Sequence, residues 1–112
     1  MNETVILVTR EGMGDAPPDL QVTLITTYLK LLIENELNPA AICFYGNGVK
    51  LVVEGSPVVG LLETLEARGV HVVICMTCLR YFNLSDKVKV GIVGGMGDIL
   101  AAQVKAAKVI SL

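Results

Sequence analysis

Two cysteines, Cys75 and Cys78, are the residues of this sequence best suited to chemistry. They are separated by Met76 and Thr77 and end the apolar, β-rich run Val70–Cys75. A thiolate is a strong nucleophile, and a thiol at the start of a helix or near a cation ionises below the pKa of ~8.5 of a free cysteine. We therefore expect this turn to hold a nucleophilic thiolate.

The residues after the motif predict how this thiolate is stabilised. We predict a short helix over Leu79–Phe82 with Thr77 as its N-cap, which places the Cys78 sulfur beside the first free N–H groups of the helix. Arg80 adds positive charge nearby. A fall in pKa from ~8.5 to ~6 would raise the thiolate fraction at pH 7 from roughly 3% to about 90%. This argument favours Cys78 as the nucleophile.

The sequence gives less support to the other common roles of a C-x-x-C pair, zinc binding and thioredoxin-like redox chemistry. Zinc takes about four ligands, the motif supplies two, and Cys43 and His71 are not spaced to complete a site. Thioredoxin-like proteins carry a cis-proline strand after the motif, whereas all four prolines here precede Cys75. Cys43 lies inside an apolar run and is predicted to be an inert core residue. We expect no metal and no cofactor.

Other catalytic classes lack their residues. The single histidine, His71, begins a predicted strand and therefore lies at the edge of the sheet opposite the thiols. The chain has no G-x-S-x-G nucleophile motif, no P-loop and no G-x-G-x-x-G. Gly-Met-Gly-Asp occurs at Gly12–Asp15 and Gly95–Asp98. We expect ordinary strand-to-helix turns there, of a type that can present N–H groups to an anion.

The composition describes one small domain. The 112 residues are 53% hydrophobic and 18% charged, with a net charge of −2, which excludes a disordered chain and a broad nucleic-acid surface. The mean hydropathy of +0.63 is high, yet the longest uncharged stretch has 13 residues, against about 20 for a membrane span. Met1–Thr4 lacks a basic region and three cysteines suggest no disulfide framework, so we expect a cytoplasmic protein.

Apolar β-rich runs alternate with helical patterns along the chain. The predicted strands are Val5–Thr9, Ala40–Tyr45, Val70–Cys75, Val88–Val93 and Val109–Leu112. The predicted helices are Asp19–Leu37, Pro57–Arg68 (with Ser56 as its N-cap), Leu79–Phe82 and Asp98–Ala107, while Val49–Val53 is expected to be short and extended. This alternation predicts an α/β sandwich with a mostly parallel sheet of about five strands.

Ligands of such sheets gather outside the carboxyl ends of the strands. The segments expected at that edge are Glu11–Asp15, Tyr45–Gly48, Cys75–Cys78 and Gly94–Asp98. The predicted helix Asp19–Leu37 carries more apolar residues than contact with one sheet requires, so we expect it also to contact a neighbouring subunit of a homo-oligomer.

Several short motifs, taken together, resemble one known family. They are the Cys-Met-Thr-Cys-Leu turn at Cys75–Leu79, Asn-Gly-Val-Lys-Leu at Asn47–Leu51, Glu54–Ser56, Leu84–Lys87, and Val90-Gly91 with Met96 and Asp98. The chain resembles the DsrE/DsrF-like family of sulfur-relay proteins over nearly its whole length. Within that family it is most similar to the DsrE-like C-terminal half of the selenium-metabolism proteins called YedF.

The resemblance implies a three-layer α/β/α sandwich, homotrimers or hexamers, and a cysteine that carries sulfur as a persulfide. It also implies exchange with a TusA/SirA-like carrier protein in trans, since the TusA-like N-terminal domain of YedF is absent from this sequence. Family members with one cysteine in this turn match Cys75, whereas the helix argument favours Cys78, and both stay open. Met76 stands where the common C-G-T-C motif has glycine, and its larger side chain is expected to narrow access to the cysteines.

These expectations combine into one function and two alternatives. The protein accepts sulfane sulfur or selenium on Cys75 or Cys78 and passes it on, without nucleic-acid or membrane partners. The residues expected around the anionic persulfide are Thr77, Gly46, Asn47, Gly48, Gly94, Gly95 and Met96. The alternatives are a non-catalytic oligomeric module that binds a small anion or nucleotide, and a thiol–disulfide switch.

Overall fold

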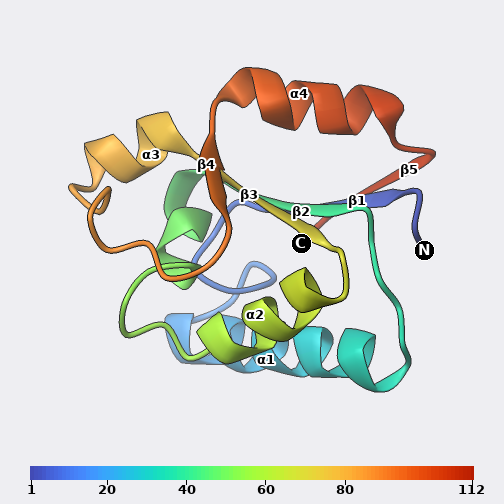
Figure 1. The fold of residues 1–112 in the computed structure, drawn as a ribbon. Coiled ribbons are helices and arrows are strands. Elements are labelled where there is room, and N and C mark those ends of the chain that lie inside the picture. The colour runs from blue at the N-terminus through green and yellow to red at the C-terminus, as the bar shows by residue number, and fades with distance from the viewer.

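A five-stranded sheet, parallel throughout, forms the middle of the molecule. The computed structural model describes residues 1–112, and the order of strands across the sheet is β4-β3-β2-β1-β5 (Figure 1). The strands are β1 (Thr4–Val8), β2 (Ala41–Phe44), β3 (His71–Cys75), β4 (Ile92–Gly94) and β5 (Lys108–Ser111). The predicted class, an α/β protein with a parallel sheet of five strands, is confirmed.

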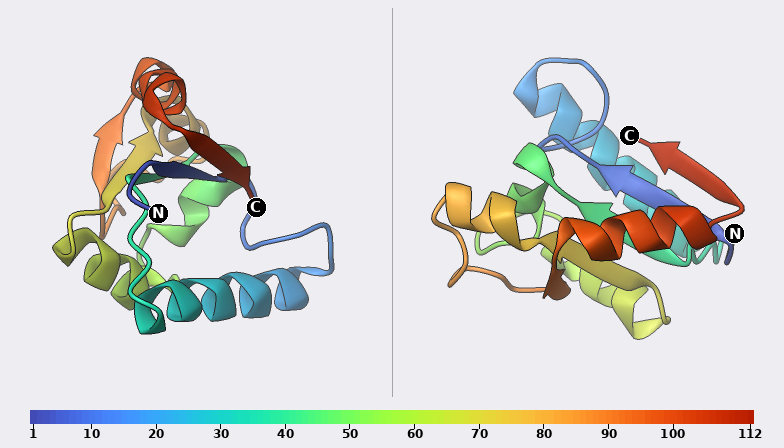
Figure 2. Two further views of the ribbon diagram at one scale, coloured as in Figure 1. Left: turned by 90° about the vertical axis from the view of Figure 1, so that its right-hand side faces the viewer. Right: turned by 90° about the horizontal axis from the view of Figure 1, so that it is seen from above.

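Helices cover both faces of this sheet. One layer holds α1 (Pro18–Glu34) and α2 (Val59–Ala67), and the opposite layer holds α3 (Met76–Tyr81) and α4 (Met96–Lys105) (Figures 1 and 2). A 3₁₀ helix, η1 (Gly46–Leu51), follows β2 at the carboxyl edge of the sheet. None of the helices combines the length and apolar character that crossing a membrane requires.

Alternate residues of the central strands enter two separate cores. In β1, Ile6 and Val8 join the larger core under α1 and α2, whereas Val5 and Leu7 join a smaller core beside α4. All five residues of β1 are therefore buried, as expected for a parallel strand covered on both faces. Cys43 is completely buried in the smaller core, which confirms its prediction as a core residue.

Two segments differ from the prediction because they bond to each other instead of to the sheet. Val53 and Val88 form an isolated antiparallel bridge, supported by hydrogen bonds from Glu54 N–H to Lys87 O and from Lys89 N–H to Val52 O, both 2.9 Å. The predicted strand Val88–Val93 is therefore reduced to Ile92–Gly94, and Val49–Val53 is mostly 3₁₀ helix, not extended. Gly91, with φ of +93°, turns the chain back into the sheet.

Several predicted helix boundaries also shift. The first helix ends at Glu34, before Leu37, because Glu36 takes a left-handed conformation with φ of +54°. Helix α2 begins at Val59, since the Ser56 hydroxyl accepts the Val58 N–H at 3.3 Å in a preceding turn instead of capping the helix at Pro57. Helix α4 begins at Met96, two residues before the predicted start.

The close approach of η1 to β1 gives a stability test. A Cβ at Gly48 would lie 2.1 Å from the Val8 carbonyl oxygen, a backbone atom that cannot move aside. We expect Gly48→Ala to lower the free energy of unfolding by about 1–3 kcal/mol in urea denaturation followed by circular dichroism. Gly60→Ala, at a helical position with open space around it, is the control and is expected to stabilise by about 0.5–1 kcal/mol. Equal stability of the two variants would contradict this packing argument.

Candidate thiol site

Strand β3 continues directly into α3, and this junction positions both cysteines of the motif. Cys75 is the last residue of β3 and the N-cap of α3, and Cys78 is the third residue of the helix. The prediction of Thr77 as N-cap is therefore wrong. The backbone of Cys75, at φ −70° and ψ 116°, already takes the cap conformation, so Thr77 lies exposed inside the helix.

The two cysteines differ in their access to solvent. Cys75 is 1% exposed and packs in the smaller core with Ile99 of α4. Cys78 is partly exposed and contacts the margins of both cores. A donor molecule can therefore reach Cys78 in the folded protein, while Cys75 is shielded from solvent.

One hydrogen bond holds the Cys78 sulfur. The Gly46 N–H donates to Cys78 Sγ at a donor–acceptor distance of 3.1 Å. Gly46 follows β2 and starts η1 with φ of +59°, a left-handed conformation that favours glycine. The carboxyl end of β2 thus supplies the donor, and the first turn of α3 supplies the sulfur.

The electrostatics of Cys78 differ from the expectation. Burial raises the pKa of the Cys78 thiol above its ordinary value, the Gly46 N–H lowers it in part, and the adjacent Cys75 thiol raises it further. The predicted fall in pKa is wrong for the resting protein, because one N–H does not offset burial. An ordinary cysteine is only roughly 3% ionised at pH 7, and Cys78 is ionised less than that.

Two of the predicted binding residues meet the cysteines. Gly46 contacts Cys78 directly, and Gly94 is the partner of Cys75 in the β3–β4 register. Asn47 follows Gly46 and is exposed. Together with Cys75 and Cys78, these residues lie at the carboxyl ends of the neighbouring strands β2, β3 and β4. The sequence predicted that these ends share one edge of the sheet.

The remaining residues predicted to surround the persulfide make other hydrogen bonds or lie on the surface. The Gly95 N–H donates to Asp98 Oδ2 at 2.8 Å and so caps α4 instead of facing a ligand. The Gly48 N–H donates to the Tyr45 carbonyl at 3.0 Å. Met96 begins α4 and is exposed. Neither Gly48 nor Gly95 therefore has a free N–H group for an anionic persulfide.

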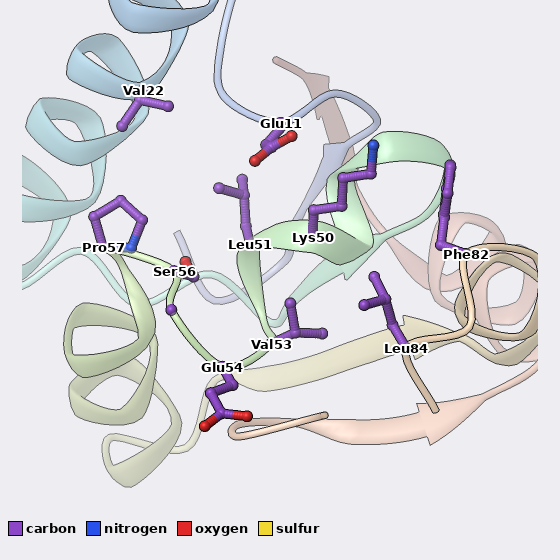
Figure 3. Close-up of a pocket in the computed structure, with 11 residues that line it drawn as sticks. Glu11, Val22, Lys50, Leu51, Val53, Glu54, Ser56, Pro57, Phe82 and Leu84 are labelled. Atoms are coloured by element: carbon purple, nitrogen blue, oxygen red, sulfur yellow. The ribbon is translucent and has the colours of Figure 1, made fainter. Parts of the chain in front are cut away.

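Sequence reasoning missed a cation beside the thiol helix. Lys50 Nζ lies 4.4 Å from the centre of the Phe82 ring, and Phe82 caps the C-terminus of α3. Both residues line a hollow of about 350 Å³ between η1, α1 and the segment that leads to α2 (Figure 3). No local sequence signal points to this contact, since Lys50 and Phe82 lie far apart in the sequence.

The other ionisable groups are placed much as predicted. Burial raises the pKa of the Cys43 thiol to about 11, which leaves it unreactive near neutral pH. His71 is the exposed first residue of β3, at the amino edge of the sheet and away from the thiols. No three His, Cys, Asp or Glu side chains lie close enough to share a metal ion.

The sequence and the fold identify the family. The profile of the DsrE/DsrF-like family matches residues 5–112, so the chain belongs to that family. No curated protein has a significantly similar sequence.

Three solved structures share the fold at low sequence identity. A protein of unknown function, MTH1491 from Methanobacterium thermoautotrophicum, is 19% identical with a TM-score of 0.71 over 97% of each chain. The ychN protein from E. coli is 16% identical with a TM-score of 0.71, over 98% of this chain and 99% of its own. BT1422 from Bacteroides thetaiotaomicron is 18% identical with a TM-score of 0.64, over 99% and 96%.

The burial of the three thiols leads to a direct chemical test. We expect iodoacetamide to alkylate Cys78 roughly tenfold or more faster than Cys75 and Cys43 in the native protein, because only Cys78 is accessible. The rate should rise with pH through a midpoint above that of an ordinary cysteine, as the raised pKa requires. Peptide mass spectrometry measures each site, and the protein in urea, where all three should react alike, is the control. Faster labelling of Cys75 would contradict this assignment.

Proposed function

We propose that this protein is a sulfur-relay protein that carries sulfane sulfur as a persulfide on Cys78. The observation that carries the proposal is the partly exposed Cys78 sulfur, held by the Gly46 N–H at the carboxyl edge of the sheet. Membership of the DsrE/DsrF-like family supports the same type of chemistry. Cys75 is the less suitable acceptor because it is buried.

The loading step is an exchange at sulfur. Cys78, once it has lost its proton, attacks the outer sulfur of a donor persulfide R–S–SH. A Cys78–S–SH bond forms, the R–S bond to that sulfur breaks, and R–S⁻ leaves with the electron pair. The Gly46 N–H, already within hydrogen-bond distance of Sγ, stabilises the Cys78 thiolate before it attacks. We propose a TusA/SirA-like carrier as the acceptor of the persulfide sulfur.

A second candidate, the thiol–disulfide switch, is favoured by the contact between the two thiols. Cys75 lies close enough to Cys78 to raise its pKa. In this version the Cys75 thiolate attacks the Cys78 sulfur of the persulfide, a disulfide forms and HS⁻ leaves. The two cysteines are oxidised and the sulfane sulfur is reduced to sulfide. A cellular thiol would then reduce the disulfide.

The identity of the cargo belongs to the same proposal. The resemblance to YedF-type proteins makes selenium the alternative to sulfur. Attack by Cys78 on R–S–SeH follows the same course as attack on R–S–SH, with the same leaving thiolate. Parallel incubation with both donors distinguishes the two cargoes by the mass added to the protein.

We also propose that copies of this chain assemble through a surface formed by α4 and β4, the α4–β4 surface. Its members are apolar and exposed: Ile92, Met96, Leu100 and Val104, with Leu100 at 59% and Val104 at 77%. Met96, Leu100 and Val104 recur every four residues and so form one stripe along the helix. Helix α1, the expected contact, also exposes Leu20, Leu24 and Leu31.

Persulfide loading tests the proposed function. After incubation with a persulfide donor and removal of excess reagent, we expect intact-mass spectrometry to show one added sulfur atom in the wild type and in Cys75→Ser, and none in Cys78→Ser. A wild-type product that lacks two hydrogens and carries no sulfur would favour the disulfide switch. Loss of the adduct in Cys75→Ser alone would overturn the assignment to Cys78. No change in any sample would favour a non-catalytic binding module.

Charge insertion tests the assembly surface. We expect Leu100→Glu to shift the protein to monomers in size-exclusion chromatography with light scattering, because a carboxylate buried in an apolar interface is left unpaired. Leu31→Glu, at a similarly exposed site on α1, is the matched comparison and is expected to retain the assembly. Monomers from Leu31→Glu but not from Leu100→Glu would move the interface to α1. A monomeric wild type would refute assembly.

A further inference from the structure

Two adjoining hollows lie beside the thiol helix. The first, of about 350 Å³, is lined by Leu51, Val53 and Phe82 among others, and the second has a volume of about 390 Å³. They share Glu11, Val22 and Lys50. We refer to the two together as the Lys50 groove, since this side chain lies on the wall between them.

The Lys50 groove carries charges of both signs along a partly apolar wall. Lys50 and Arg10 supply the cations, Arg10 from the second hollow. Glu11 faces both hollows, and Glu54 lies at the end of the first hollow away from Lys50 (Figure 3). A ligand that bears both carboxylate and ammonium groups matches this arrangement. A purely anionic ligand would leave the Glu11 carboxylate without a cationic partner and would be repelled by it.

Two features connect the groove with the Cys78 sulfur, which itself lies outside the walls of both hollows. Phe82 lines the first hollow and lies four residues after Cys78, a rise of about 6 Å along the helix. Asn47 lines the second hollow and follows Gly46, which donates its N–H to Cys78 Sγ. A ligand in the groove that extends past Asn47 or Phe82 would approach the segments that hold the sulfur.

We propose that the Lys50 groove binds a low-molecular-weight persulfide of the amino-acid or small-peptide type, such as cysteine persulfide or glutathione persulfide. Its carboxylates pair with Lys50 and Arg10, and its ammonium group pairs with Glu11 or Glu54. The contact with the Phe82 ring holds the Lys50 ammonium at the wall. This inference rests on the proposed function and names the donor for the same thiol.

The transfer balances without a further reactant. Cys78–S⁻ and R–S–SH give Cys78–S–SH and R–S⁻, where R–SH is cysteine or glutathione. One sulfur–sulfur bond forms while another breaks, so nothing is oxidised overall. The released thiolate takes up a proton and leaves the groove.

Single-turnover loading with two donors, followed over a range of donor concentrations, tests the proposal. Glutathione persulfide has charged groups for the groove, and 2-hydroxyethyl persulfide has none outside its reacting sulfur. For glutathione persulfide we expect Lys50→Gln and Arg10→Gln each to raise the half-saturating donor concentration about tenfold with little change in the maximal loading rate, because each removes a charged pairing outside the reacting centre. For 2-hydroxyethyl persulfide we expect no change in either variant.

Matched variants separate binding charge from structural damage. Lys50→Arg keeps the cation and should restore most of the loss. Lys30→Gln removes an exposed lysine of α1 that lines neither hollow and should behave as wild type. Direct binding of S-methylglutathione, an unreactive thioether, to the Cys78→Ser protein should weaken to the same extent in the Lys50→Gln and Arg10→Gln backgrounds.

The outcomes distinguish failure of the groove proposal from failure of the proposed persulfide carrier. Loading by both donors with equal half-saturating concentrations, unaffected by Lys50→Gln and Arg10→Gln, would overturn the groove proposal and leave the persulfide carrier intact. Loading by a protein persulfide alone would also overturn it. Absence of an adduct from every donor would contradict the proposed function itself.

Discussion

The hydrogen bond from the Gly46 N–H to Cys78 Sγ joins two parts of the chain that are 32 residues apart. It forms because β2 and β3 are parallel neighbours, so the segments after them, η1 and α3, leave the sheet side by side. Gly46, in a left-handed conformation with φ of +59°, leads the chain from β2 into η1 at the point where its N–H meets the sulfur. The sheet register and one glycine thus define the position of the candidate nucleophile.

The same arrangement limits how reactive the resting thiol is. Burial and the neighbouring Cys75 raise the pKa of Cys78, and the Gly46 N–H recovers only part of that shift. A thiol that is mostly protonated at neutral pH reacts slowly with oxidants, because the thiolate is the reactive form. Under the proposed function, a bound donor or partner protein would have to supply a further hydrogen bond or a positive charge to the Cys78 sulfur to lower its pKa.

Much of the fold was predictable, because buried parallel strands leave a strong local pattern. The runs that became β1 and β3 are rich in Val, Ile and Leu, and β2, Ala-Ile-Cys-Phe, is apolar throughout with Cys43 inside it. The 3₁₀ helix η1 and the shortened β4 were not predictable, since the bridge between Val53 and Val88 is a long-range pairing. The Cys-x-x-Cys turn was visible in the sequence, whereas Cys75 is buried in a core whose members come from distant parts of the chain, Val5 of β1 and Ile99 of α4 among them. The ring contact of Lys50 with Phe82 likewise joins segments that no local pattern connects.

The two cysteines therefore differ by their position in one strand-to-helix junction. Cys75 is the last residue of β3, and its side chain packs in the smaller core. It is therefore shielded from a donor but adjacent to Cys78. Cys78 lies one helical turn further and opens toward solvent. Gly94 of β4 runs beside Cys75, and the exposed α4 stripe starts two residues later at Met96. A subunit docked on the α4–β4 surface would border the shielded thiol, whereas the Lys50 groove is lined by residues of neither α4 nor β4.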